Sequence, residues 1–110
     1  MTSNAFKITE EKLPDAPELA RRVKALAEQA ERQDGMAPLS EQFLNGLSDS
    51  RLQHRHLVAW AGEEPCGVAS LEGSTAELFI APDFRGQGYG AALYLSLIHI
   101  SEPTRLLSIS

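Results

Sequence analysis

The stretch AELFIAPDFRGQGYGAAL, residues 76–93, constrains the fold of this chain more than any other segment. An apolar run at 78–80 is typical of a β-strand, and Pro82 ends it. The next residues, RGQGYG at 85–90, place three glycines in one turn, and the Ala-Ala-Leu that follows is typical of the start of a helix. We therefore predict a strand, a short loop, a glycine-rich turn and a helix, in that order.

The glycine-rich turn predicts a site for an anion. Glycine lets backbone N–H groups approach a ligand closely, because no Cβ intervenes. The N-terminus of the helix adds unpaired N–H donors and a partial positive charge. A phosphate or diphosphate group is the ligand that these features favour.

The pattern Arg-x-x-Gly-x-Gly-Ala after a strand, at 85–91, resembles the acyl-CoA pyrophosphate loop of the GCN5-related N-acetyltransferase (GNAT) family. The resemblance implies that the strand flanks the pantetheine arm of acetyl-CoA and that the loop binds its pyrophosphate. The cofactor-binding residues that it implies are Leu78, Phe79, Ile80, Arg85, Gly86, Gln87, Gly88, Tyr89, Gly90 and Ala91.

Two other interpretations of the turn stay open. The spacing Gly86-x-Gly88-x-x-Ala91 also fits the dinucleotide-binding pattern G-x-G-x-x-G/A. That fingerprint normally lies directly at the end of a first strand, whereas here the loop 81–85 intervenes and two helical patterns precede it. The third interpretation is a purely structural glycine turn. We favour acyl-CoA over both.

Composition bounds the class of protein. A chain of 110 residues suits one domain. Fifteen acidic against ten basic residues give a net charge of -5, which argues against a nucleic-acid partner. The single cysteine, Cys66, cannot form an internal disulfide, so we expect a reducing compartment. The sequence shows neither a signal peptide at its start nor a membrane-spanning run, so we expect a cytoplasmic protein without a membrane partner.

Periodicity and turn residues predict the order β-α-α-β-β-β-α, an α/β (α+β) fold that matches the opening order of the GNAT fold. We expect Asp15 and Ser40 to cap the two helices through their side chains, and the turn 62–65 to join a hairpin. The expected elements are a strand at 5–9, a helix from Pro17 to Asp34, a short helix after Ser40, strands at 56–60 and 66–71, the strand from Ala76 and the helix after the glycine turn.

The end of the chain does not fit the rest. Pro103 follows early in what should be a long amphipathic helix. The segment LSLIHISEPTR at 95–105 is similar to the translated read-through of a transposase-type sequencing adaptor. We expect residues 1–94 to be the N-terminal part of one GNAT domain and 95–110 to be a non-native tail. The expected fold is therefore truncated, lacks its C-terminal strands, leaves one edge of the strand at 76–80 unpaired and is inactive as a fragment.

Three segments resemble the mycothiol synthase (mycothiol acetyltransferase) family more closely: DGMAPLSEQ at 34–42, HLVA at 56–59 and AELFI at 76–80. Members of that family contain two tandem GNAT domains and transfer acetyl from acetyl-CoA to the cysteinyl amine of a cysteine–glucosamine–inositol conjugate. The resemblance implies that this chain is the N-terminal domain of such an enzyme, with a second tandem domain as its partner. It also implies that Glu41 binds the amine substrate. The family often has consecutive arginines before the glycines, where this chain has RGQ at 85–87.

The chemistry that the resemblance implies is direct attack of a neutral amine on the thioester, aided by a base. Glu77 is the candidate catalytic base, and its alternative role is a solvent-facing or edge carboxylate. Glu41 has the alternative role of stabilising a helix start. Cys66 is expected to pack, because this chemistry needs no cysteine nucleophile. His54 and His56 lack a third ligand nearby in sequence, so no metal is expected.

Three functions remain open at this level. The first is an acetyl-CoA-dependent N-acetyltransferase of mycothiol biosynthesis. The second is a single-domain GNAT acetyltransferase with an unknown amine substrate, and the third is a non-catalytic acyl-CoA-binding domain. A second glycine-rich motif further along the coding sequence would favour the first of these.

Overall fold

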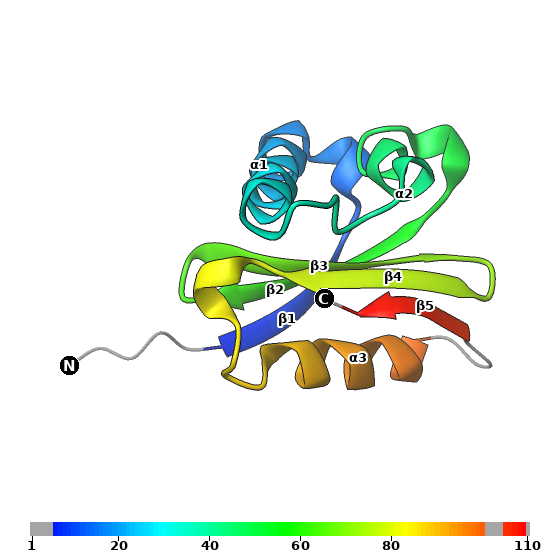
Figure 1. Ribbon diagram of the computed structural model, residues 1–110. Helices are drawn as coiled ribbons and strands as arrows, with labels where there is room; N and C mark the ends of the chain where they lie inside the picture. The colour runs from blue at the N-terminus through cyan, green and yellow to red at the C-terminus, as the bar shows by residue number, and fades with distance from the viewer. Residues whose placement is uncertain (1–5, 101–104, 110) are drawn as a thin grey trace.

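The computed structural model describes residues 6–100 and 105–109 (Figure 1). The order β-α-α-β-β-β-α is confirmed, and a further strand follows it. The helices and strands are β1 (Phe6–Glu11), α1 (Pro17–Asp34), α2 (Glu41–Gly46), β2 (Arg55–Ala61), β3 (Glu64–Glu72), β4 (Thr75–Ile80), α3 (Tyr89–Ile100) and β5 (Arg105–Ile109), with 3-10 turns η1 (Leu13–Asp15), η2 (Ser50–Leu52) and η3 (Pro82–Phe84).

The strands form one sheet in the order β1-β2-β3-β4-β5. Neighbouring strands are antiparallel from β1 to β4, whereas β5 runs parallel to β4. Helices α1 and α2 cover one face of the sheet and α3 covers the other (Figure 1). The glycine turn connects the end of β4 to α3, so it lies where the chain crosses from the sheet to the second helical layer.

Two hydrophobic clusters hold the layers together. Val58, Val68 and Phe79 face α1 and α2, and their neighbours along the strands, such as Leu57 and Leu78, face α3. Successive side chains of a strand point to opposite faces of a sheet, so both clusters draw on β2, β3 and β4. These central strands are buried on both faces, which explains their nearly continuous apolar runs.

Helix α1 packs one face on the sheet and ends where the sequence indicates. Val23 and Ala30 are fully buried, and Gly35 takes the left-handed conformation, φ 82°, directly after the last helical residue. The two predicted side-chain caps are wrong. The N-cap of α1 is Ala16, because Asp15 lies within η1, and Ser40 occupies the N-cap position of α2 without a side-chain hydrogen bond.

The β2–β3 hairpin is confirmed, with a tighter turn than predicted. Gly62 and Glu63 alone separate the strands, and Gly62 has φ 66°. Pro65 lies inside β3, opposite Trp60. Because Gly67 is opposite Ala59, Cys66 is the extra residue of a β-bulge.

The strand that follows α3 corrects one expectation. β5 pairs with β4 from Thr75 to Leu78, so that part of the β4 edge is not unpaired. Helix α3 itself continues to Ile100 and packs through Leu93 and Leu97, while Leu95 is 60% exposed. Within the described residues, no helix is long and apolar enough to cross a membrane.

Candidate functional site

The glycine turn has an open, donor-rich geometry. Gly86 and Gly88 have φ of 81° and 83°, a left-handed conformation that residues with a Cβ rarely adopt. Among the described residues, apart from the immediate chain neighbours, no heavy atom lies within 4 Å of the position that a Cβ would take at either glycine. The N–H of Ala92 donates to the carbonyl of Gly88 at 3.1 Å, so the preceding amides at 89–91 belong to the unpaired first turn of α3. This arrangement suits an anionic group above the turn.

Tyr89, the first residue of α3, packs its ring against two aromatic side chains. Its ring stacks on Phe6 of β1, with centroids 4.3 Å apart and planes 7° apart. Phe84 of η3 lies against the same ring, 6.4 Å between centroids. The side chain of Tyr89 is half-buried, while Gln87, in the middle of the turn, is exposed.

Strand β4 can offer a ligand its backbone edge, because the side chains of Leu78, Phe79 and Ile80 are all buried. Pairing with β5 reaches only to Leu78, so the last two residues of β4 have no strand partner on that side in the described part of the chain. The N–H of Ala81 donates to the carbonyl of Cys66 in β3 at 2.8 Å. Across a trans peptide, the carbonyl of Ile80 therefore points to the outer edge, as does its N–H.

Arg85, the first residue of the motif, is engaged by the protein. Its Nε donates to the carbonyl oxygen of Ile80 at 2.9 Å. Its Nη1 and Nη2 donate to the two carboxylate oxygens of Asp34, at 3.0 and 2.8 Å. These hydrogen bonds lower the pKa of the Asp34 carboxyl and raise that of the guanidinium. Local sequence patterns do not predict this contact, because the two residues are 51 positions apart in the chain.

Glu77 lies on the face of β4 that α1 and α2 cover, and it is only 7% exposed. Its Oε1 accepts a hydrogen bond from the backbone N–H of Ser40 at 2.8 Å. The interpretation of Glu77 as a solvent-facing carboxylate is therefore wrong. Glu41 follows Ser40 directly and is exposed at the start of α2. The structure thus brings the candidate base and the candidate substrate residue to the same connection.

A row of buried polar side chains crosses the sheet beneath α2. His56 of β2 pairs in register with Ser70 of β3, which pairs with Glu77 of β4. Nε2 of His56 lies 3.0 Å from the carbonyl oxygen of Gly46, which can only accept, so we assign the proton to Nε2. Nδ1 then accepts from the hydroxyl of Ser70 at 2.8 Å. Ser70 is fully buried, so its hydroxyl is not accessible to a substrate in this structure.

Burial determines the charge of His56. Desolvation lowers its pKa to about 4, against the smaller, opposite effect of the hydrogen bond to Gly46. The ring is therefore neutral at pH 7 and acts as a connector between β2, β3 and the end of α2. From the sequence, we weighed His56 only as a metal ligand, expected no metal there, and did not predict this role.

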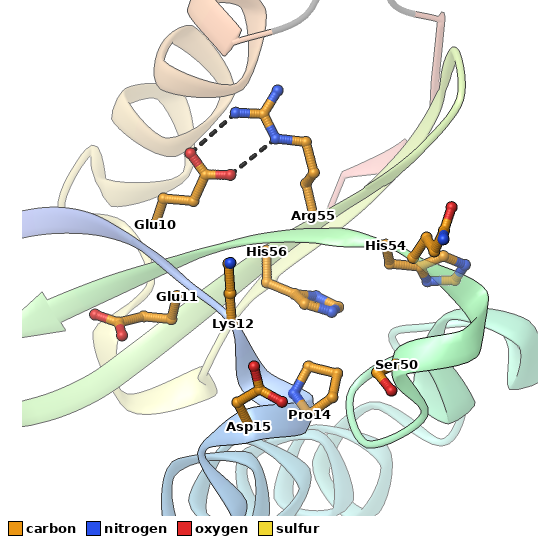
Figure 2. A pocket seen from close by; sticks show the side chains of 10 residues that line it. Glu10, Glu11, Lys12, Pro14, Asp15, Ser50, His54, Arg55 and His56 are labelled. Atoms are coloured by element: carbon orange, nitrogen blue, oxygen red, sulfur yellow. Dashed lines mark hydrogen bonds and ion pairs between the residues drawn. The ribbon is translucent and has the colours of Figure 1, made fainter.

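A separate pocket of about 410 Å³, lined mainly by polar residues, lies at the end of the sheet away from the glycine turn. Figure 2 shows the side chains that line it. Arg55, at the start of β2, pairs with the end of β3, and the end of β3 pairs with the start of β4. The glycine turn follows the other end of β4, so the pocket and the turn lie at opposite ends of the sheet. The ion pair of Glu10 and Arg55 lies on the α3 side of the pocket, and Asp15 lies on the α1 side. Nδ1 of His54 is buried there without a hydrogen-bond partner among the described residues.

Cys66 is confirmed as a packing residue. It is fully buried in the α3-facing cluster. Burial raises the pKa of its thiol to about 11. A neutral, inaccessible thiol cannot act as a nucleophile at neutral pH.

The fold agrees with comparisons to known proteins. Residues 16–108 match the Acetyltransferase (GNAT) family, and the chain belongs to this family. Among solved structures, an aminoglycoside acetyltransferase from a soil metagenome in complex with sisomicin has a TM-score of 0.61 at 14% identity, covering 96% of this chain and 76% of that one. PaiA N-acetyltransferase from Thermoplasma acidophilum, in complex with coenzyme A, has a TM-score of 0.54 at 18% identity, covering 87% and 71%. These likenesses concern the fold.

Curated relatives are more similar in sequence. Mycothiol acetyltransferase of Corynebacterium aurimucosum is 58% identical over 81 residues, which cover 74% of this chain and 27% of that protein. The protein of the same name from Corynebacterium diphtheriae is 43% identical over 90 residues, covering 80% and 30%. The chain thus spans less than a third of the length of these relatives.

Proposed function

We propose that this chain is part of an acetyl-CoA-dependent N-acetyltransferase. The observation that carries the proposal is the glycine turn, because Gly86 and Gly88 leave open space directly before the unpaired amides of α3. Such a turn suits the diphosphate of coenzyme A. The pantetheine arm, an extended chain with two amides, would lie along the β4 edge that β5 leaves uncovered beyond Leu78.

The acceptor we propose is the cysteinyl amine of the mycothiol precursor. This rests on the 58% and 43% identity to proteins named mycothiol acetyltransferase. Glu41, exposed at the first turn of α2, carries a negative charge that suits an ammonium group before deprotonation. We further propose a second tandem domain in the intact protein, since the matched relatives are much longer, and a cytoplasmic location, where the single thiol stays reduced.

The proposed reaction joins the acceptor nitrogen to the acetyl carbonyl carbon and breaks the bond from that carbon to the thioester sulfur. The acceptor arrives as an ammonium group and must lose two protons in all, and Glu77 is the proposed base for the first because it is the buried carboxylate on β4. The outward-facing N–H of Ile80 is placed to donate to a carbonyl on the strand edge, which stabilises charge developing on oxygen. The free thiol of CoA carries away the other proton.

A non-catalytic acyl-CoA-binding domain is the second candidate, and one contact favours it. Oε1 of Glu77 is already used by the N–H of Ser40, so the carboxylate has a structural role that needs no proton transfer. Replacing Glu77 by Gln in the intact protein separates the two functions. Loss of acetyl transfer with retained CoA binding supports the base, and unchanged transfer supports the non-catalytic domain.

Binding of CoA by the glycine turn is tested with a pair of glycine variants. Gly88→Val fills the open space above the turn and strains a backbone at φ 83°, so CoA affinity should fall at least tenfold. Gly73→Val is the matched control, because Gly73 also has a left-handed conformation, φ 62°, and open surroundings, but lies in the β3–β4 turn. Equal loss in both variants would contradict the proposal. Acetyl transfer to the cysteine–glucosamine–inositol conjugate, compared with other primary amines, then tests the acceptor.

A further inference from the structure

Arg85 joins three segments that meet at the glycine turn. It is the residue directly before Gly86, and its side chain reaches the carbonyl of Ile80 at the end of β4 and the carboxylate of Asp34 at the end of α1. Three of its N–H groups are used in these contacts. The resemblance of the motif implied that Arg85 holds phosphates, whereas here its charge is paired within the protein.

The contact to Ile80 matters because of where that carbonyl points. The Ile80 carbonyl faces the outer edge of β4, beyond the last residue paired with β5. Nε of Arg85 satisfies this carbonyl and so fixes the direction in which the chain leaves the strand. The position of the glycine turn therefore depends on this hydrogen bond.

The contact to Asp34 links the turn to the opposite layer. Asp34 is the last residue of α1, and Gly35 then starts the connection that carries Ser40 and Glu41. The pair is bidentate and about two-thirds buried, with side-chain exposures of 32% and 30%. A fork-to-carboxylate pair of this kind fixes geometry as well as charge. A carboxylate beside a diphosphate site would otherwise repel the ligand.

We propose that Arg85 and Asp34 are a positioning pair that holds the glycine turn in its ligand-ready geometry, and that Arg85 is not itself a phosphate ligand. This rests on the proposed binding of CoA by the turn. Asp34 is acidic and lies near the anion site, yet it increases the affinity for the anion, because it holds Arg85 in place.

The sign of one mutational effect separates the two roles of Arg85. If Arg85 were a phosphate ligand, Asp34→Asn would release its charge and remove a repulsive carboxylate, so CoA would bind more tightly. If the pair positions the turn, Asp34→Asn weakens CoA binding, and we expect a three- to tenfold loss by calorimetric titration. Arg85→Lys should lose as much, because lysine keeps the charge but cannot form the fork. Glu31→Gln is the matched control, since it removes one exposed carboxylate from the same end of α1.

A second measurement needs no ligand. Amide hydrogen exchange across 86–90 should be faster in Asp34→Asn and Arg85→Lys than in the wild type and in Glu31→Gln. Tighter CoA binding by Asp34→Asn, or unchanged exchange in the turn, would overturn the proposal. A wild-type chain that does not bind CoA at all would count against the proposed function, and the exchange data would still decide the role of the pair.

Discussion

The carboxylate of Glu77 and the backbone N–H of Ser40 form a hydrogen bond of 2.8 Å that ties the central strand β4 to the start of α2. Ser40 is the N-cap residue of that helix and does not use its own side chain as a cap. The bond therefore fixes the connection between α1 and α2 over the sheet, and with it the position of Glu41. This single contact links the candidate base to the candidate substrate residue.

Removal of the Glu77 carboxylate should destabilise the protein through this bond. Glu77→Ala leaves the Ser40 N–H without its partner and a gap in the core, which should lower the free energy of unfolding by ~1–3 kcal/mol. Glu77→Gln keeps an acceptor oxygen of the same reach and should cost less than ~1 kcal/mol. Chemical denaturation of the three proteins measures both values. Equal stability of Glu77→Ala and the wild type would contradict this role.

His56 should make stability depend on pH in the acidic range. Its pKa is about 4 when folded and about 6.5 when unfolded, so between these values the unfolded chain binds the additional proton. Stability is therefore highest above pH 6.5 and falls as the pH drops toward 4, by at most ~3 kcal/mol from this group. Unfolding measured from pH 7 to pH 4 tests the prediction, with His56→Gln as the control that should flatten the curve. A folded-state pKa near 6.5 by NMR would contradict it.

Gly67 should tolerate alanine poorly. A Cβ at this position would lie 2.7 Å from the backbone oxygen of Phe79 and 2.5 Å from Cδ1 of Ile80, so the β3–β4 pair would have to separate. We expect Gly67→Ala to cost ~1–3 kcal/mol. Gly46→Ala is the comparison, because the three atoms nearest to its Cβ all belong to the ring of His54, a partly exposed side chain rather than backbone. A thermal melt should show the larger drop in melting temperature for Gly67→Ala. The reverse order would contradict this close packing of β3 on β4.

Cys66 should be unreactive in the folded protein. Its thiol is fully buried and burial raises its pKa to about 11, so a thiol reagent at pH 8 should react only as fast as the chain unfolds. Denaturant should restore the full reaction rate. Rapid modification of native protein would contradict this description. Cys66→Ser keeps the volume and serves as the blank.

The origin of residues 95–110 is tested at the level of DNA. We propose that they are a non-native tail, because 95–105 resembles a translated sequencing adaptor. When the coding DNA across Tyr94 is read with a method that uses no transposase adaptor, we expect different codons after Tyr94. If the codons persist, the tail is native, and the pairing of β5 with Thr75–Leu78 is then part of the natural fold.

Local patterns were sufficient for much of the fold. The strand at 78–80, the glycine turn that follows it and the end of α1 at Asp34 were each predicted from a few adjacent residues, and the structure agrees. The side-chain caps at Asp15 and Ser40 were predicted by the same reasoning and are absent. At Ser40 a tertiary contact holds the start of α2 instead of a side-chain cap, because the backbone N–H of Ser40 donates to the carboxylate of Glu77.

By itself, the sequence determined the order of elements, the position of the glycine turn and the membership of an acetyltransferase family, because all three depend on short-range patterns. Only the tertiary structure decided that Arg85 pairs with Asp34, that His56 joins Ser70 and Gly46, and that Glu77 is buried against Ser40. Each of these contacts joins residues that strand register and helix packing bring together across the sheet, and a buried polar group takes whichever partner that packing supplies.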